Sequence, residues 1–144
     1  MFIDPRGPRF AAAVTSIVLA AVLVSGSRWL LAAQAVVFAL GVANRSPYTL
    51  VFRRLVQPRL TPPAALEDVR PLRFAQAVGL GFVLAAGAAL ALGGGSVANL
   101  LIATALVAAL LNAAIGFCLG CEIYLLARRS SLLPAVRPQK EIHA

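Results

Sequence analysis

Two cysteines and a glutamate carry most of the chemistry that this sequence offers, within Cys118-Leu119-Gly120-Cys121-Glu122. Residues three and four apart share one face of a helix, so Cys118, Cys121 and Glu122 are expected to lie together. Two thiols at this spacing can form a disulfide, bind a soft metal or pass sulfur between them. The carboxylate of Glu122 can accept a thiol proton or pair with an arginine. We therefore take all three as candidate catalytic residues.

Packing is the alternative role for this segment. Cysteine is a small apolar residue that packs well between helices, and Gly116 and Gly120 form a small-xxx-small pair typical of helix contacts in membranes. Glu122 is harder to explain by packing, because an ionisable residue in an apolar run is costly unless it is paired or functional. A structural pair between Glu122 and an arginine and a chemical role for Glu122 both stay open.

The residues around this segment indicate a membrane protein. Hydrophobic residues make up 60% of the 144-residue chain, above the proportion in soluble domains, and the mean hydropathy is +0.88. The excess lies in four long apolar runs, at 10–24, 29–43, 74–92 and 97–127. The last run is about 45 Å long as a helix, more than the ~30 Å hydrocarbon core, so it must tilt, kink or project. We predict an all-α membrane protein with four transmembrane helices.

The runs divide the chain into one domain and a tail. We expect a membrane domain over 1–129, with a first hairpin at about 9–44, a linker at 45–70 and a second hairpin at about 71–129. Within the linker, apolar residues alternate with arginines after Ser46-Pro47, which favours a short basic amphipathic helix on the membrane surface over a plain basic loop. The tail, 130–144, is expected to be disordered and cytoplasmic.

The basic residues predict how the chain is oriented. Twelve of the 13 flank the apolar runs on one side, and only Arg28 falls on the other. The positive-inside bias makes the rich side cytoplasmic, so we expect a multi-pass protein with both termini in the cytoplasm. The same placement favours contact with membrane lipids and argues against nucleic acid, despite a net charge of +8.

An internal repeat links the two hairpins. The pattern D-x-R-x-x-R-F-A-x-A-V occurs at 4–14 and again at 68–78. Both copies enter the membrane from the same side, which predicts parallel repeats related by an axis along the membrane normal. The arginines of both copies fall at helix starts, where the helix dipole disfavours cations. Lipid phosphate with Asp4 and Asp68 can compensate them, or Arg9 and Arg73 can form an anion-binding or thiolate-stabilising site.

The sequence also resembles a known family. The string F-C-x-G-C-x-x-Y, together with the arginine repeat, is similar to a family of small bacterial membrane proteins, common in actinobacteria, known only as a domain of unknown function. The resemblance covers about residues 2–129, and the string is matched by Phe117, Cys118, Gly120, Cys121 and Tyr124. It implies a thiol-redox or sulfur context in the bacterial plasma membrane, with a thioredoxin-like or sulfurtransferase-like partner.

The leading functional hypothesis is a membrane thiol-redox or sulfur-relay protein without a cofactor. In it Cys121, nearer the surface, meets the soluble partner, Cys118 acts as the second thiol, and Glu122 tunes protonation. One alternative is a carrier of a soft metal or small sulfur anion, with Cys118 and Cys121 as ligands beside Glu122 or a second subunit. Another is a structural subunit or assembly factor without chemistry of its own. A homodimer or larger membrane complex is compatible with each, and whether the chain is an enzyme stays open.

Overall fold

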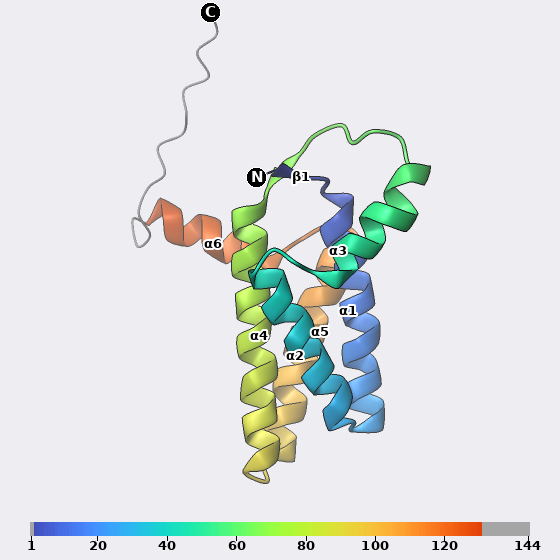
Figure 1. Cartoon of the computed structure of the whole chain (residues 1–144). Helices are drawn as coiled ribbons and strands as arrows, with labels where there is room; N and C mark the ends of the chain where they lie inside the picture. The colour runs from blue at the N-terminus through green and yellow to red at the C-terminus, as the bar shows by residue number, and fades with distance from the viewer. Residues whose placement is uncertain (1, 131–144) are drawn as a thin grey trace, which may run out of the picture.

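The computed structural model describes residues 2–130 as a helical bundle with shorter helices gathered toward one end (Figure 1). The bundle consists of α1 (Arg6–Ser25), α2 (Arg28–Val42), α4 (Val69–Ala91) and α5 (Gly95–Ile115). The shorter helices are α3 (Pro47–Val51), the π-helix η1 (Phe52–Val56), the 3-10 helix η2 (Gln57–Arg59) and α6 (Leu119–Arg129). The predicted disordered tail, 130–144, lies outside the described residues except for Ser130.

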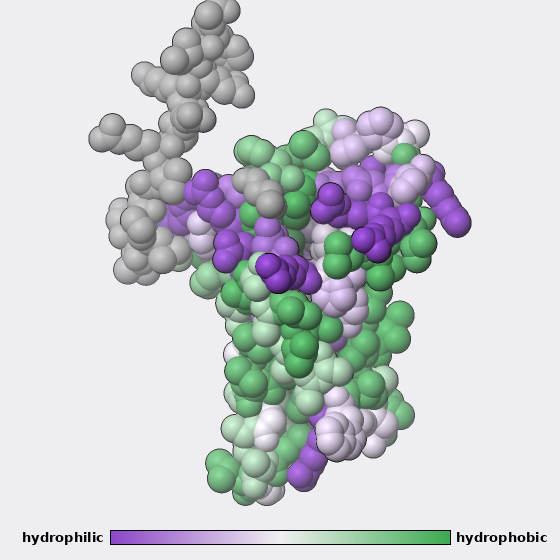
Figure 2. All heavy atoms as spheres, viewed as in Figure 1, coloured by the Kyte–Doolittle hydropathy of each residue, from purple (hydrophilic) through white to green (hydrophobic). Residues whose placement is uncertain are grey.

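Three of the bundle helices, α1, α4 and α5, are long and apolar enough to cross a membrane. Helix α2 has 15 residues, about 22 Å, and reaches a spanning length only together with Pro47–Arg59, which is bent by 74° from it. The outside of the bundle is apolar along most of its length, whereas hydrophilic residues gather at the end that carries α3 and α6 (Figure 2). The all-α class with three to four spans is therefore confirmed, and the chain is a multi-pass membrane protein.

The helix boundaries follow from caps in the sequence. Helix α1 ends at Gly26, which adopts a left-handed φ of 65°, a conformation that glycine reaches without steric cost. Ser27 then caps α2, because its side chain accepts a hydrogen bond from the Leu30 N–H at 3.3 Å. The Asp68 carboxylate caps α4 in the same way, accepting from the Arg70 N–H at 3.0 Å. These caps fix where the chain enters and leaves the bundle.

Each helix of one hairpin packs mainly on a helix of the other hairpin. Helix α1 of the first packs most extensively on α5 of the second, and α4 of the second packs on α2 of the first. The short strands β1 (Phe2–Ile3) and β2 (Glu67–Asp68) pair antiparallel, with Ile3 opposite Glu67. Ile3 and Glu67 are equivalent positions of the repeat, so an approximate twofold axis passes between them.

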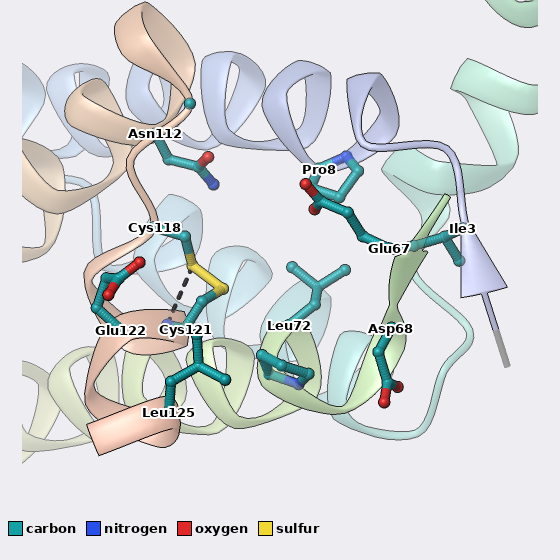
Figure 3. Close-up of a pocket in the computed structure, with 12 residues that line it drawn as sticks. Ile3, Pro8, Glu67, Asp68, Leu72, Asn112, Cys118, Cys121, Glu122 and Leu125 are labelled. Atoms are coloured by element: carbon teal, nitrogen blue, oxygen red, sulfur yellow. Dashed lines mark hydrogen bonds between the residues drawn. A yellow bond between two sulfur atoms is a disulfide. The ribbon is translucent and has the colours of Figure 1, made fainter. Parts of the chain in front are cut away.

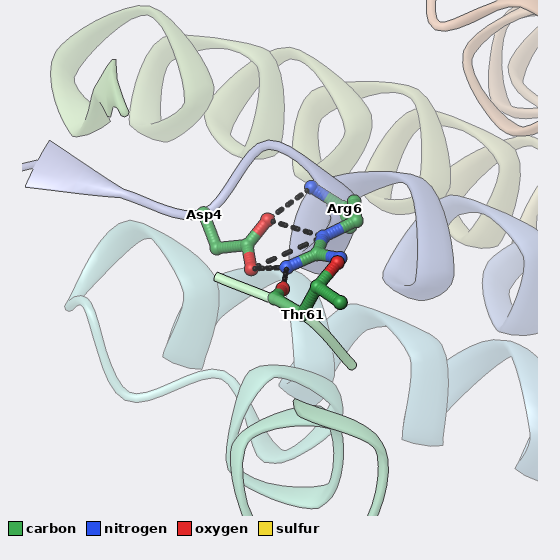
Figure 4. A network of polar contacts seen from close by, with 3 residues as sticks. All are labelled: Asp4, Arg6 and Thr61. Atoms are coloured by element: carbon green, nitrogen blue, oxygen red, sulfur yellow. Dashed lines mark hydrogen bonds and ion pairs between the residues drawn. The ribbon is translucent and has the colours of Figure 1, made fainter. Parts of the chain in front are cut away.

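The D-x-R part of the repeat forms an ion pair in both copies. Arg6 binds Asp4 at 2.8 Å and also donates to the Thr61 carbonyl, which ties the linker to the start of α1 (Figure 4). Hydrogen bonds from Arg6 hold the pKa of the Asp4 carboxyl below its usual value. Arg70 pairs with Asp68 at 3.6 Å. The aspartates therefore compensate the first arginine of each copy.

The linker contains the helical stretch that the alternation of apolar and basic residues predicts. Helices α3, η1 and η2 follow one another from Pro47 to Arg59, with Phe52 buried and Arg53 and Arg54 exposed. The helix over this stretch is confirmed. Its position on a membrane surface stays a prediction, as does the cytoplasmic orientation of the basic end.

A buried glutamine joins three helices in the first repeat. The Gln34 side chain on α2 is fully buried, donates to the Thr15 hydroxyl on α1 at 3.4 Å and accepts from the Tyr48 hydroxyl on α3 at 3.0 Å. Gln34→Leu should lower the free energy of unfolding by about 1–2 kcal/mol, because it leaves these hydroxyls without the amide. Equilibrium unfolding in mixed micelles measures this, with Gln57→Leu on η2 as control. Equal stability of the two variants would contradict the bridging role.

Candidate functional site

A break between α5 and α6 places the two cysteines. The run 97–127 is not one helix, so the expectation of a single fourth helix carrying both thiols is wrong. Helix α5 ends at Gly116, which has a φ of 73° and whose N–H bonds the Asn112 carbonyl at 2.9 Å. Helix α6 starts three residues later, at Leu119, and runs away from the bundle (Figure 1). The excess length of the run therefore forms a separate helix at the end of the bundle.

Cys118 and Cys121 form a disulfide across the first turn of α6 (Figure 3). Their Cα atoms are 5.1 Å apart, within the range that a disulfide spans. Cys118 is the N-cap residue, and its Sγ accepts a hydrogen bond from the Cys121 N–H at 3.2 Å. Both residues are half-buried. The pair is thus held at the start of a helix rather than in its middle.

The disulfide lines a cavity of about 310 Å³ between α6, α4 and the β-strand pair. Three carboxylates line this thiol cavity, Glu67, Asp68 and Glu122, out of five acidic residues in the chain. None of the described lining residues is basic. Since Asp68 is paired with Arg70, the acidic character of the lining comes from Glu67 and Glu122.

Glu122 lies in the first turn of α6 and is exposed. The helix break removes the difficulty of a charge within a membrane span, because Glu122 stands outside the bundle. A carboxylate in the first turn also interacts favourably with the helix dipole. Its proposed effect on thiol protonation stays a prediction.

Close packing against α4 fixes the direction of α6. Gly120 lies so near Ala75 that an added Cβ would come within 2.6 Å of the Ala75 Cβ. One turn further along α6, the Tyr124 ring contacts Phe74 with centroids 5.7 Å apart, and Arg128 lies over the Tyr124 ring. The glycine and tyrosine of the F-C-x-G-C-x-x-Y string therefore position the cysteines.

The two arginines predicted as thiolate-stabilising residues both bind helix-end carbonyls. The Arg9 guanidinium donates to Ala114 O at 3.2 Å, at the end of α5, and packs against Gly116. Arg73 Nε donates to Val42 O at 2.8 Å, at the end of α2. Neither is among the residues that line the thiol cavity. Arg9 thus steadies the break before Cys118, and a direct role of either in thiolate stabilisation stays a prediction.

The structure adds residues to the site that sequence reasoning did not select. Pro8, Leu72 and Asn112 line the thiol cavity together with Glu67. Asn112 had a detectable signal, as one of the few polar residues in its apolar run. Pro8 and Leu72 occupy equivalent positions of the repeat, but apolar residues that differ between the copies give no sign of a shared cavity.

The repeat continues beyond the hairpins into the short helices. Asn44 after α2 and Gly116 after α5 both have a left-handed φ, of 63° and 73°. Two residues further on, Ser46 and Cys118 are the N-cap residues of α3 and α6. Helices α3 and α6 are therefore equivalent elements, and Ser46 occupies the position of Cys118.

Aromatic contacts support the same register. Phe52 in η1 contacts Phe10 with ring centroids 5.8 Å apart, as Tyr124 contacts Phe74 at 5.7 Å. Phe10 and Phe74 are equivalent residues of the sequence repeat. Phe52 thus corresponds to Tyr124, and the two copies match beyond the part that the sequence reveals.

This register predicts that a disulfide can be moved to the first repeat. Ser46 and Thr49 hold the positions of Cys118 and Cys121, and Ser46 and Cys118 share an extended ψ, of 125° and 102°. With Cys118→Ser and Cys121→Ser as background, Ser46→Cys plus Thr49→Cys should give a reversible disulfide. Counting alkylated thiols by mass spectrometry should find none after oxidation and two after reduction. Ser46→Cys alone is the control. Two free thiols after oxidation of the protein with both new cysteines would refute the equivalence of α3 and α6.

Comparisons with known proteins place the chain in a family without an assigned activity. A family model described as Domain of unknown function (DUF4395) matches residues 3–129, from β1 to the end of α6. No curated protein and no solved structure matches the chain. The function is therefore argued from the site.

Proposed function

We propose that this chain, which belongs to the family described as Domain of unknown function (DUF4395), is a membrane thiol–disulfide exchange protein. The observation that carries the proposal is the position of Cys118 as N-cap of α6, with its Sγ bonded to Cys121 and accepting the Cys121 N–H. The helix start and the Cys121 N–H favour a thiolate at Cys118 over one at Cys121, and the thiolate is the form that attacks and leaves in exchange reactions. The thiol cavity gives a partner access to it.

The exchange balances with a dithiol partner of the thioredoxin-like class. A partner thiolate attacks Cys118 Sγ and breaks the bond between the two cysteines, and Cys121 leaves as a thiolate that takes up a proton. The second partner thiol then attacks the partner sulfur of the mixed disulfide and releases Cys118. Two electrons and two protons pass from the partner to the pair, and the partner ends as a disulfide. The reverse sequence oxidises the pair.

The order of the two thiols is the reverse of the one predicted from distance to the surface. The hydrogen bond from the Cys121 N–H favours Cys118 as the thiolate that meets the partner, with Cys121 as the resolving thiol. The acidic lining of the thiol cavity suits a partner with basic residues around its own reactive cysteine. From the positive-inside bias, we expect this encounter to occur in the cytoplasm.

The reduction of the disulfide by a dithiol protein tests the proposal. The full chain in nanodiscs is incubated with reduced thioredoxin, and free thiols are counted by alkylation and mass spectrometry. We expect two thiols per chain without denaturation, and none with a thioredoxin whose active-site cysteines are both replaced. Thiols that appear only after the protein is denatured would overturn an exchange function.

The soft-metal alternative lacks a complete ligand set in the described part of the chain. Within residues 2–130, no group of three or more His, Cys, Asp and Glu side chains could hold a metal ion. A role as structural subunit would leave the disulfide inert in the nanodisc experiment. The exchange function therefore accounts best for a helix-capping cysteine pair at an accessible cavity.

A further inference from the structure

The first repeat contains a second cavity that corresponds to the thiol cavity. It is lined by Asn44, Ser46, Thr49, Leu50 and Arg53, at the positions that Gly116, Cys118, Cys121, Glu122 and Leu125 hold around the disulfide. Pro8 and Leu72 line both cavities. The two cavities are therefore neighbours that share Pro8 and Leu72, which are equivalent residues of the repeat.

The charge of this second cavity is opposite to that of the thiol cavity. Arg45, Arg53 and Arg73 line it, and no carboxylate is among its described lining residues. All three arginines are exposed, and the ion pairs of the described chain join other arginines, Arg6 and Arg70, to aspartates. Leu50 holds the position in this cavity that Glu122 holds in the thiol cavity, so the second cavity lacks that carboxylate. The lining thus collects positive charge without an acidic partner.

The lining also supplies directed hydrogen-bond donors. Arg73 uses Nε for the Val42 carbonyl, which anchors its guanidinium and leaves the Nη donors for a ligand. The Ser46 hydroxyl makes no capping hydrogen bond, and the Thr49 hydroxyl and the Gln76 amide lie in the same lining. The anchored guanidinium of Arg73, two further arginines and the hydroxyl and amide groups suit oxygens spread around one centre, as in phosphate or sulfate.

We propose that this second cavity binds a tetrahedral oxyanion, either the phosphate of an anionic lipid or a free sulfate-like ion. Its volume is about 80 Å³, far below the roughly 300 Å³ at which pockets for drug-sized molecules begin, so it accepts a single oxyanion group. The two repeats thus hold a thiol site and an anion site back to back. The anion site does not depend on the exchange function of the cysteines.

Equilibrium binding of radiolabelled sulfate tests this proposal. The full chain is placed in nanodiscs of phosphatidylcholine, and sulfate is titrated at constant ionic strength against chloride. We expect saturable binding that Arg45→Gln and Arg53→Gln each weaken about tenfold or more, since each removes a charge-assisted hydrogen bond. Arg59→Gln, an exposed arginine on η2 outside the lining, is the matched control and should bind as the unchanged protein does.

A second arm identifies the source of the oxyanion. In nanodiscs with phosphatidylglycerol, a lipid phosphate is assigned to the site if two results are found together. Sulfate binding is lost, and the protein retains phosphatidylglycerol in a manner that depends on Arg45 and Arg53. Sulfate binding that persists in phosphatidylglycerol assigns it to a free oxyanion. If Arg45→Gln and Arg53→Gln match Arg59→Gln in both sulfate binding and lipid retention, the proposal is overturned. The assay uses no thiol, so it can also be run with Cys118→Ser, and its failure is separate from a failure of the exchange function.

Discussion

Replacing Cys121 with serine should leave a thiol at Cys118 that traps a mixed disulfide with a dithiol partner, whereas Cys118→Ser should trap little. The reason is that the hydrogen bond to Cys118 Sγ comes from the backbone N–H of residue 121, which Cys121→Ser retains. In the Cys118→Ser variant the new hydroxyl oxygen accepts the hydrogen bond from the N–H of residue 121, so α6 stays capped. The Cys121 thiol gains no hydrogen-bond donor in that variant. A hydrogen bond to a charged group contributes about 1.5–3 kcal/mol, which corresponds to tenfold or more in thiolate population.

The rate of alkylation by iodoacetamide at pH 7 measures this difference without any partner. We expect Cys118 in the Cys121→Ser variant to react at least tenfold faster than Cys121 in the Cys118→Ser variant, for both proteins in nanodiscs. Alkylation of each variant after denaturation is the control, because both thiols should then react alike. Equal rates in the folded proteins, or a faster Cys121, would return the leading role to Cys121.

The part of the fold that could be predicted from the sequence follows from strong local signals. Long apolar runs set the membrane helices, and the arginine repeat showed that two hairpins are related. Compensation of the repeat arginines by Asp4 and Asp68 was one of the two alternatives that the sequence left open, and both aspartates form ion pairs, with Arg6 and Arg70. These features depend on neighbours in the chain, and so the sequence contains them directly.

The length of the run 97–127 predicted a tilt, kink or projection, but the position of the break could not be predicted from the sequence. Gly116 lies in an apolar run rich in small residues, where a glycine is as compatible with helix packing as with a helix end. Its left-handed φ of 73° is stabilised by the docking of α6 on α4 and by Arg9 at the end of α5, both of which are tertiary contacts. A sequence pattern with a 3.6-residue period does not report them.

The second half of the repeat is not visible in the sequence, because equivalent positions share a backbone conformation and not a residue type. Ser46 and Cys118 share the role of an N-cap, which several small polar residues can fill, and Asn44 and Gly116 share a left-handed φ. Tyr48 and Tyr124 each lie shortly before a pair of arginines in the sequence, but they are not equivalent in the fold. Phe52 contacts Phe10 as Tyr124 contacts Phe74, so Phe52 is the residue that corresponds to Tyr124. The correspondence of the two cavities is therefore a property of the folded chain that the sequence does not reveal.

Gly120→Ala should release α6 from the bundle and disturb the disulfide site. An added Cβ would lie 2.6 Å from the Ala75 Cβ and 2.7 Å from its Cα, far inside the ~3.5–4.0 Å at which carbon atoms pack well. Neither of these atoms can rotate away, so the clash can only be relieved by moving one helix. Crowding of this kind costs about 1–3 kcal/mol, and here the cost falls on the contact between Tyr124 and Phe74 that holds α6 down.

Hydrogen exchange of the α6 amides, followed by mass spectrometry, is the measurement. We expect exchange about 5- to 140-fold faster for the Gly120→Ala protein, because 1.4 kcal/mol corresponds to a factor of ten in the opening equilibrium. Gly81→Ala on α4 is the matched control, since an added Cβ there meets nothing within 4 Å and alanine favours a helix over glycine. Unchanged exchange in α6 would show that its docking does not depend on the glycine of the cysteine motif. Faster exchange with slower reduction by thioredoxin would tie that glycine to the placement of Cys118 and Cys121.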